Sequence, residues 1–298
     1  KDMDIDLLKT FLEVYRTRHF GRTAENLYLT QSAVSARIRL LEETLGAPLF
    51  TRTRNDIQLT AAGTRLLKYA DTILNAWNRV RQDSALGEED KISLAIGGAY
   101  SLWDILLQDL THRLYSELPH VVLQAEAHGP EVLIRRLLDR ALDIAFMFEP
   151  TPMAELEVRE IALIKLIMVA DRPDLMAREA VGNGYIMTDW GTSFAVAHVR
   201  HFPEIPPPAI RMGLGRMALA FLLHNGGATY LAEQMVDEYL LSGRLHRVED
   251  APVIDRRVYA VYPLASERKA LLEQVLGFLK PAYSPPEKAY AADVVPTL

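Results

Sequence analysis

The pattern of apolar residues changes its period near Lys91. Before this point apolar residues recur at spacings of three and four, which is the period of amphipathic helices. After it, short apolar runs alternate with helical stretches, which favours parallel strands covered by helices on both faces. The 298 residues are therefore expected to form a small, mainly helical head and a larger α/β body.

The head is expected to begin with three short helices. The first covers 5–17, and the second covers 23–27 after a break at 20–22. The third begins after Thr30, whose hydroxyl can cap it, and ends before Gly46. Because helices this short bury little apolar surface alone, we expect them to pack together.

The third helix is expected to expose a polar face opposite its apolar stripe. At about 100° per residue, this face and its flanks carry six residues: Gln31, Ser32, Ser35, Ala36, Arg37 and Arg39. Small side chains allow close approach to a surface, whereas Gln and Arg can read base edges in the major groove through paired hydrogen bonds. The start of the helix can also face a phosphate group.

An extended segment at 49–59 follows, with a turn at Asn55–Asp56. This segment predicts a hairpin that carries two arginines, so the whole head is typical of a winged helix-turn-helix. The predicted DNA-binding residues are Thr30, Gln31, Ser32, Ser35, Arg37, Arg39, Arg52 and Arg54. The alternative is an ordinary three-helix subdomain with a solvated basic face.

Charge is distributed unevenly between the head and the body. The whole chain has a net charge of -6, which argues against a protein that coats nucleic acid with its entire surface. Residues 1–87 nevertheless carry 13 Lys and Arg against 10 Asp and Glu, whereas the remainder carries 20 against 29. This asymmetry indicates an anionic partner for the head.

Residues 5–90 resemble the DNA-binding head of the LysR-type transcriptional regulators. The resemblance is carried by an ordered set of motifs: LLKTF at 7–11, TAENL at 23–27, LTQSAVS at 29–35, IRLLE at 38–42, LG at 45–46, LFTR at 49–52 and LTAAG at 59–63. One departure is Ser32, where many members have proline. The resemblance implies a sequence-specific regulator of transcription that binds double-stranded operator DNA.

A long helix is expected to begin at Thr60. Its apolar residues are spaced 4, 3, 4 and 3 apart, as in a heptad seam: Leu66, Ala70, Ile73, Trp77 and Val80. The resemblance implies that this linker helix joins two subunits, so that a homodimer or homotetramer binds a partly palindromic operator. A lone helix could instead bury the same stripe against its own domain. The polar residues 87–90 are expected to end the linker.

The body resembles the effector-binding domain of the same family, which has two α/β subdomains like those of periplasmic binding proteins. The best local matches are 136–148 and 225–231. The expected strands are 92–96, 121–127, 143–148, 163–170, 185–188, 228–231 and 258–262, and the expected helices are 102–118, 131–141, 194–201, 217–224 and 266–280.

The fold class is thus α/β, with an N-terminal winged helix-turn-helix, a long linker helix and a periplasmic-binding-protein-like effector domain. The expected boundaries are 1–60 for the head, 61–90 for the linker, 91–280 for the effector domain and 281–298 for a loosely ordered tail. Subdomain I comprises about 91–163 and 266–280, and subdomain II about 164–265, with crossovers near 162–170 and 263–266.

A small-molecule effector between the subdomains would contact loops at the carboxyl ends of strands. The predicted effector-binding residues lie in those loops: Tyr100, Ser101, His128, Phe148, Trp190, Thr192, Ser193 and Gly227. Hydroxyls and backbone N–H groups suit an anion, and the resemblance implies a small organic acid or metabolite. Glu149 would repel an anion, and a cleft without any ligand is the alternative.

Other chemistry has little support in the sequence. The chain has no cysteine, which excludes disulfides and thiolate metal sites, and its eight histidines are scattered; His198 and His201 could share one helix face. We expect no metal, no cofactor and no catalysis, since the sequence has no nucleophile elbow, phosphate-binding loop or zinc-protease motif.

A cytoplasmic protein without membrane contact is expected. No run reaches the roughly 18 apolar residues that span a bilayer, and no apolar signal region follows residues 1–4. Two other classes stay open, a solute-binding protein and an α/β enzyme with an appended DNA-binding head. The operator, the target genes, the effector, the choice between activation and repression, and the choice between dimer and tetramer also stay open.

Overall fold

The computed structural model describes residues 4–53, 56–85, 91–182, 184–208 and 210–279. Its contacts divide the chain into two units, the head (1–91 with 139–141) and the body (92–138 with 142–298). The long helix expected as a separate linker thus belongs to the unit of the head. The expected linker end at 87–90 and the expected tail at 281–298 lie outside the described residues.

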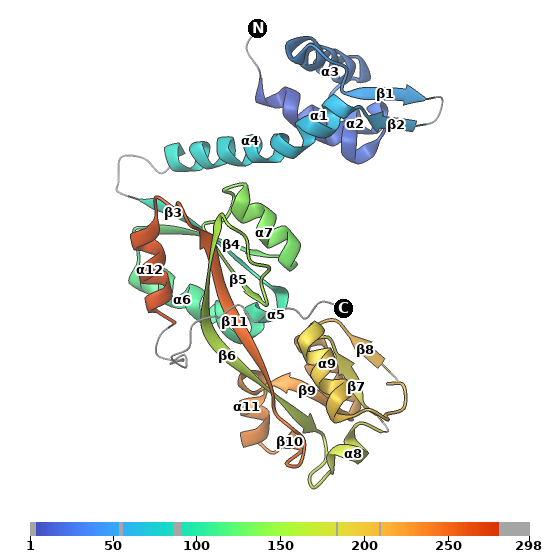
Figure 1. Ribbon diagram of the computed structural model, residues 1–298, viewed down its shortest axis with the longest axis vertical. Coiled ribbons are helices and arrows are strands. Elements are labelled where there is room, and N and C mark those ends of the chain that lie inside the picture. The colour runs from blue at the N-terminus through green and yellow to red at the C-terminus, as the bar shows by residue number, and fades with distance from the viewer. Residues whose placement is uncertain (1–3, 54–55, 86–90, 183, 209, 280–298) are drawn as a thin grey trace, which may run out of the picture. The chain divides into compact units, whose positions relative to one another are not determined.

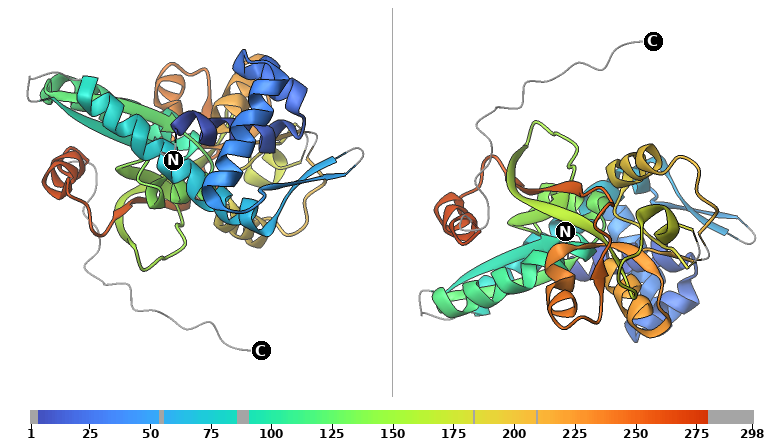
Figure 2. Two further views of the ribbon diagram at one scale, coloured as in Figure 1. Left: turned by 90° about the horizontal axis from the view of Figure 1, so that it is seen from above. Right: turned by 90° about the horizontal axis from the view of Figure 1, so that it is seen from below.

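The head contains four helices and one hairpin among its described residues (Figure 1). They are α1 (Ile5–Thr17), α2 (Phe20–Leu27), α3 (Gln31–Leu45), β1 (Phe50–Thr53), β2 (Asp56–Leu59) and α4 (Ala61–Ala85). The β1–β2 hairpin extends beyond the helices as a narrow wing (Figure 2). The predicted winged helix-turn-helix is therefore confirmed, with α1 and α3 at the expected bounds.

The predicted break at 20–22 is wrong, because α2 begins at Phe20. The chain turns at Arg18, which ends α1 with a left-handed φ of 50°. The side chain of His19 then caps α2, since its Nδ1 accepts a hydrogen bond from the backbone N–H of Arg22 at 3.1 Å. Histidine is not among the common capping residues, which is why the sequence pattern missed this helix start.

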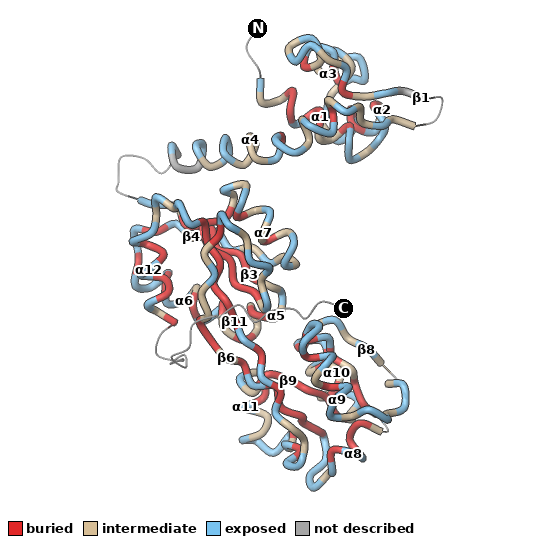
Figure 3. The backbone as a smooth tube through the Cα atoms, in the orientation of Figure 1, coloured by how far each residue is buried: buried red, intermediate tan, exposed pale blue. Residues whose placement is uncertain are grey.

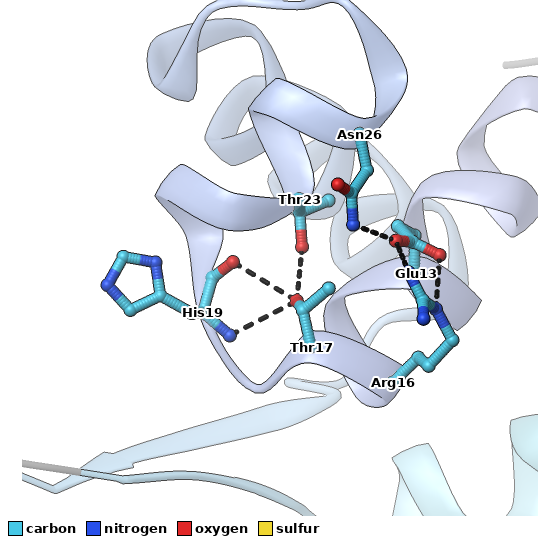
Figure 4. A network of polar contacts seen from close by, with 6 residues as sticks. All are labelled: Glu13, Arg16, Thr17, His19, Thr23 and Asn26. Carbon is cyan, nitrogen blue, oxygen red and sulfur yellow. Dashed lines mark hydrogen bonds and ion pairs between the residues drawn. The ribbon is translucent and has the colours of Figure 1, made fainter.

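A polar network joins α1 to α2 at this turn (Figure 4). The Thr17 and Thr23 hydroxyls share a hydrogen bond of 2.6 Å, and the Thr17 hydroxyl also accepts from the His19 backbone N–H at 3.2 Å. Glu13 Oε1 accepts from Asn26 Nδ2 at 2.7 Å. Thr23 is fully buried, so this network orients α2 without leaving a buried hydroxyl unpaired.

The head has one apolar core, to which each of α1 to α4 contributes. Its buried members are Leu7, Leu8, Phe11, Val14, Phe20, Ala24, Val34, Ile38, Leu41, Leu49 and Ala70. Because α1, α2 and α3 are short, each of them buries its apolar stripe only in the assembled head.

The predicted seam on α4 is divided between two environments. Ala70 is fully buried in the core of the head, and Leu66 and Ile73 are partly buried against the same core. Trp77 and Val80 are 44% and 55% exposed, and Figure 3 shows exposed residues along much of α4. The seam prediction is therefore wrong for Ala70, because the helices and hairpin of the same head cover this part of α4.

In its described residues, the body is built on one large mixed sheet of seven strands, together with a small two-stranded sheet. The large sheet contains β3 (Ile92–Gly98), β4 (Val121–Ala127), β5 (Ile144–Phe148), β6 (Leu156–Ala170), β9 (Ala228–Ala232), β10 (His246–Arg247) and β11 (Ile254–Pro263), in the order β10-β6-β11-β5-β3-β4 with β9 also paired to β6. The small parallel sheet contains β7 (Ile186–Thr188) and β8 (Ile210–Met212).

The expectation of parallel sheets is only partly correct. The strand β3 pairs in parallel with β4 and β5, whereas β11 pairs antiparallel with both β5 and β6. The chain passes from subdomain I to subdomain II in β6 and returns in β11, so these two strands must run in opposite directions. The crossover predicted at 263–266 therefore lies earlier, within 254–263.

Helices cover both faces of the sheet. They are α5 (Tyr100–Leu102), the π-helical turn η1 (Trp103–Leu107), α6 (Gln108–Glu117), α7 (Pro130–Leu138), α8 (Ala177–Ala180), α9 (Thr192–His201), α10 (Gly215–Asn225), α11 (Glu233–Leu241) and α12 (Lys269–Gly277). Alternate residues of β3 and β5 enter opposite cores, as the two-residue period of a strand requires: Leu94 and Ile144 share a core with α6 and α12, and Ala145 shares another with α7. These central strands are largely buried (Figure 3).

His198 on α9 lies inside an aromatic cluster in subdomain II. Its ring centroid is 5.6 Å from that of Tyr185, 5.5 Å from Phe194, 5.2 Å from Phe202 and 5.9 Å from Tyr230. His198 is 1% exposed, and its Nε2 shares a hydrogen bond of 2.7 Å with the Tyr185 hydroxyl. Burial lowers the pKa of His198 to about 4. His198 therefore packs in the core of subdomain II.

We expect acid to weaken the folded protein through His198. Below its ordinary pKa of about 6.5 the unfolded chain takes up a proton, whereas the folded protein does not until about pH 4. Stability is therefore lost as the pH falls between these values, by about 2 kcal/mol at pH ~4.5. Urea unfolding across this range should show a steeper fall for the parent than for His198→Phe, and parallel curves would contradict the prediction.

Candidate DNA-binding surface and effector cleft

The helix α3 presents most of the predicted DNA-binding residues on one face. Thr30 caps the helix, because its Oγ1 accepts from the backbone N–H of Ala33 at 3.2 Å and lies 2.9 Å from Ser32 Oγ. The buried side of the helix consists of Val34, Ile38 and Leu41. The other side leaves Thr30, Gln31, Ser32 and Arg39 exposed and Ser35 half-buried. This side thus combines small residues with two long hydrogen-bonding side chains.

Arg37 does not belong to this face. Its Nη1 donates to Thr10 Oγ1 at 3.3 Å, and its Nη2 lies 3.9 Å from Asp6 Oδ2. Hydrogen bonding from Lys9, and the charges of Lys9 and Arg37, lower the pKa of Asp6 despite some burial. In this arrangement Arg37 ties α3 to α1. These contacts give Arg37 a structural role, and its predicted role in DNA binding stays a prediction.

The wing forms as the sequence predicts. The strands β1 and β2 pair antiparallel, with Phe50 opposite Leu59 and Arg52 opposite Ile57. Arg54 lies outside the described residues. Tyr28, which the sequence analysis did not select, is 96% exposed in the turn between α2 and α3 and has a left-handed φ of 55°. No sequence pattern distinguishes such a tyrosine from a buried one.

The body contains a cleft of about 350 Å³ between its two subdomains. The loops after β3, β4, β5, β7 and β8 line it, as expected for the carboxyl ends of strands, together with Arg256 near the start of β11. Six of the eight predicted residues are among those that line it: Tyr100, Ser101, His128, Phe148, Trp190 and Thr192. Ser193 lies at the edge, where its hydroxyl donates to Glu149 Oε1.

Gly227 does not line the cleft, and its prediction is wrong. Its backbone N–H donates to Asp171 Oδ1 at 3.0 Å. Its φ is 111°, and a Cβ at this position would lie 2.2 Å from the carbonyl oxygen of Gly184. The glycine is required by this close approach of two backbone segments, and not by contact with a ligand.

Trp190 forms a wall of the cleft. It is 3% exposed, and its Nε1 donates to the carbonyl oxygen of Tyr230 at 2.9 Å. The ring also packs against Gly215, where a Cβ would lie 2.7 Å from it. Trp190 is therefore held in one position before any ligand arrives.

His128 in the cleft is oriented by the carboxylate of Glu126. Its Nε2 lies 2.9 Å from Glu126 Oε2, and Arg136 Nε lies 2.7 Å from the same oxygen. Burial raises the pKa of Glu126, but the hydrogen bonds from Arg136 and His128 outweigh it, so the net shift is downward. Glu126 thus stays ionised and holds both neighbours.

Arg256 is a charged residue of the cleft that sequence reasoning missed. It lies on β11, is 3% exposed, and donates from Nη1 to the carbonyl oxygen of Trp190. Its guanidinium lies 4.5 Å from the ring centre of Phe148, and its Nη2 lies 3.9 Å from Glu149 Oε1. Burial lowers the pKa of Arg256, and the charges of Glu149 and Asp189 oppose that shift.

Comparison with known proteins assigns these features to a family. Residues 5–64 match the bacterial regulatory helix-turn-helix protein family of the lysR type, and residues 87–284 match the LysR substrate binding domain. The chain belongs to the LysR family, and it is a DNA-binding transcriptional regulator of that type. It shares 38% identity over 283 residues with the HTH-type transcriptional regulator HdfR of Yersinia pestis, covering 92% of this chain and 95% of the relative.

HdfR of Yersinia pseudotuberculosis shows the same identity and coverage. Within the LysR family, the head together with the segments at 189–192 and 200–203 favours the HdfR subgroup, and these relatives confirm that prediction.

Solved structures confirm the two-part fold. Full-length CbnR complexed with its target DNA matches with a TM-score of 0.69 and 15% identity, covering 94% of this chain and all of that one. DarR of Vibrio fischeri in complex with DNA matches with a TM-score of 0.57 and 23% identity, covering 94% and 99%. Among the described residues, no helix has both the length and the apolar character needed to cross a membrane.

Proposed function

We propose that this chain binds a pseudo-palindromic operator as a homodimer or homotetramer, and that a small molecule in the cleft of the body modulates this binding. The observation that carries the proposal is the face of α3, where Gln31, Ser32 and Arg39 are exposed opposite a fully buried apolar side. The family is one of regulators, so catalysis is not part of the proposal. A DNA partner favours a location in the cytoplasm.

The DNA-binding residues have two different tasks in this proposal. Gln31 and Arg39 read base edges, because their side chains can form paired hydrogen bonds in the major groove. Thr30, Ser32 and Ser35 are small enough to let the helix approach closely. Arg52 on β1 and Arg54, which lies outside the described residues, bind phosphate or the minor groove, which contributes affinity but little sequence information.

Replacing Gln31 or Arg39 with alanine tests this assignment. We expect each change to weaken binding to the specific operator by about 1–3 kcal/mol, and binding to random DNA much less. Fluorescence anisotropy with both DNAs at one salt concentration measures the two losses. Arg200→Ala is the matched control, since Arg200 is an exposed arginine on α9 and lies outside the head.

Two outcomes separate the alternatives. Equal losses on both DNAs would show that these side chains only position the protein. If the parent protein binds no genomic fragment, the proposed function is wrong, and the head is an ordinary subdomain with a solvated basic face. An operator first has to be found, and genome-wide mapping of bound sites provides it.

A further inference from the structure

Glu149 joins the two subdomains across the cleft. It follows β5 in subdomain I, and it accepts a hydrogen bond from the hydroxyl of Ser193, which lies in the first turn of α9 in subdomain II. Its backbone has a left-handed φ of 45°, which is uncommon for a residue with a side chain. Glu149 is 47% exposed, so this conformation is maintained at the surface of the cleft and not in a packed core.

The first turn of α9 carries no acidic residue, although the Asp189 carboxylate just before the helix accepts from the Gly191 backbone N–H at 2.8 Å. Gly191 caps the helix without a side-chain hydrogen bond. A helix N-terminus carries a partial positive charge and unpaired N–H groups, which favour a carboxylate. Two carboxylates lie beside it: Asp189, which bonds the cap residue Gly191, and Glu149 from the other subdomain, which accepts from Ser193 within the helix itself.

The buried guanidinium of Arg256 lies close to the same Glu149 carboxylate. Arg256 is 3% exposed, its Nη2 lies 3.9 Å from Glu149 Oε1, and its Nε has no hydrogen-bond partner among the described atoms. Gly191 permits this approach, because its φ is 90° and a Cβ would lie 3.0 Å from Arg256 Nη1. A charge so far from water needs a counter-charge. Ser193, the start of α9 and Arg256 therefore form an anion position, which Glu149 occupies.

We infer that Glu149 is a built-in ligand of the cleft. Its carboxylate occupies the position of an effector anion and so connects the two subdomains across the cleft. A small carboxylate effector acts by displacing the Glu149 carboxylate from this position. This inference rests on the proposed role of the cleft as an effector site. It also accounts for an acidic residue in a cleft that otherwise suits an anion, since the acidic group is already bound to the positive groups.

Removing the side chain should open the position to an external carboxylate. We expect Glu149→Ala to bind acetate at least about tenfold more tightly than the parent, because acetate no longer competes with a tethered carboxylate. Acetate should also raise the melting temperature of Glu149→Ala toward that of the parent. The full chain is titrated with sodium acetate, against sodium chloride at the same ionic strength.

Glu273→Ala is the matched control. Glu273 pairs with Arg159 at 3.1 Å and is 46% exposed, but this pair lies on the surface outside the cleft. We expect no acetate response from this variant. If Glu273→Ala and Glu149→Ala respond equally, or if Glu149→Ala responds no more than the parent, Glu149 does not occupy an anion site.

Glu149→Gln provides a second variant in case the alanine variant folds poorly. The amide keeps an oxygen for the Ser193 hydroxyl but loses the charge, so acetate should displace it more easily than it displaces the parent carboxylate. Acetate affinity is therefore expected to rise from the parent to Glu149→Gln to Glu149→Ala, and an unchanged affinity in Glu149→Gln would contradict the inference. DNA binding by the parent is measured separately. A parent that binds DNA while Glu149→Ala shows no gain in acetate affinity would contradict the inference about Glu149 and leave the proposed DNA-binding function intact.

Discussion

Replacing Trp77 with aspartate is expected to reduce affinity for an operator with two half-sites by about 100-fold, toward the affinity for one half-site. Trp77 is 44% exposed, and Val80, three residues further along α4, is 55% exposed. In the proposed dimer this exposed part of α4 pairs with its symmetry mate, and two aspartates near the two-fold axis would repel each other. Binding to a single half-site should change little, because α3 is untouched.

The experiment measures both affinities and the mass in solution by light scattering. Ile73→Asp is an informative companion, because Ile73 packs partly against the core of its own head. That variant is expected to destabilise the head and so weaken binding to one half-site as well. If Trp77→Asp still dimerises and binds the full operator like the parent, the exposed part of α4 has no role in pairing.

Replacing Gly63 with alanine is expected to destabilise the head by about 3 kcal/mol, the upper end of what overpacking typically costs. Gly63 is buried in the first turn of α4, where a Cβ would lie 2.2 Å from the carbonyl oxygen of Leu49 and 2.9 Å from Leu59 Cδ2. Leu49 precedes the wing and is fully buried. The added methyl group would therefore push the wing away from α4.

Urea unfolding and DNA affinity report the two consequences of Gly63→Ala. Gly277→Ala is the matched control, since Gly277 lies in α12 and a Cβ there would meet nothing within 4 Å. We expect the control to be neutral or slightly stabilising, because alanine is the better helix former. A Gly63→Ala protein with the stability and DNA affinity of the parent would show that the wing can shift without cost.

Local signals predicted most of the helices and strands. The apolar period and the Thr30 cap gave α3 its bounds, and continuous apolar runs located β3, β4 and β5 to within a few residues. The helices α8 and α11 and the strands β8 and β10 were not expected. The elements α8, β8 and β10 have only two to four residues and owe their form to packing against longer neighbours, so a local pattern carries little information about them. The helix α11 was missed although its nine residues equal those of α12.

The sequence predicted most residues of the two candidate sites, but it misplaced some of them and missed others. The exposed face of α3 followed from helical geometry alone, with the exception of Arg37, whose long side chain reaches back to α1. The cleft loops followed from the rule for strand ends, with the exception of Gly227. Arg256 was missed because it lies within a strand, and strand patterns do not distinguish a buried arginine from an exposed one.

The sequence by itself determined the two-part organisation, the winged helix-turn-helix and the face of α3, because apolar periods, caps and turns act between residues close along the chain. It also determined which side of α4 is apolar. Only the tertiary structure decided that Ala70 is covered by its own head and that Glu149 meets Ser193 and Arg256. Those contacts join residues far apart in the sequence, and which surfaces meet depends on how all the elements pack at once.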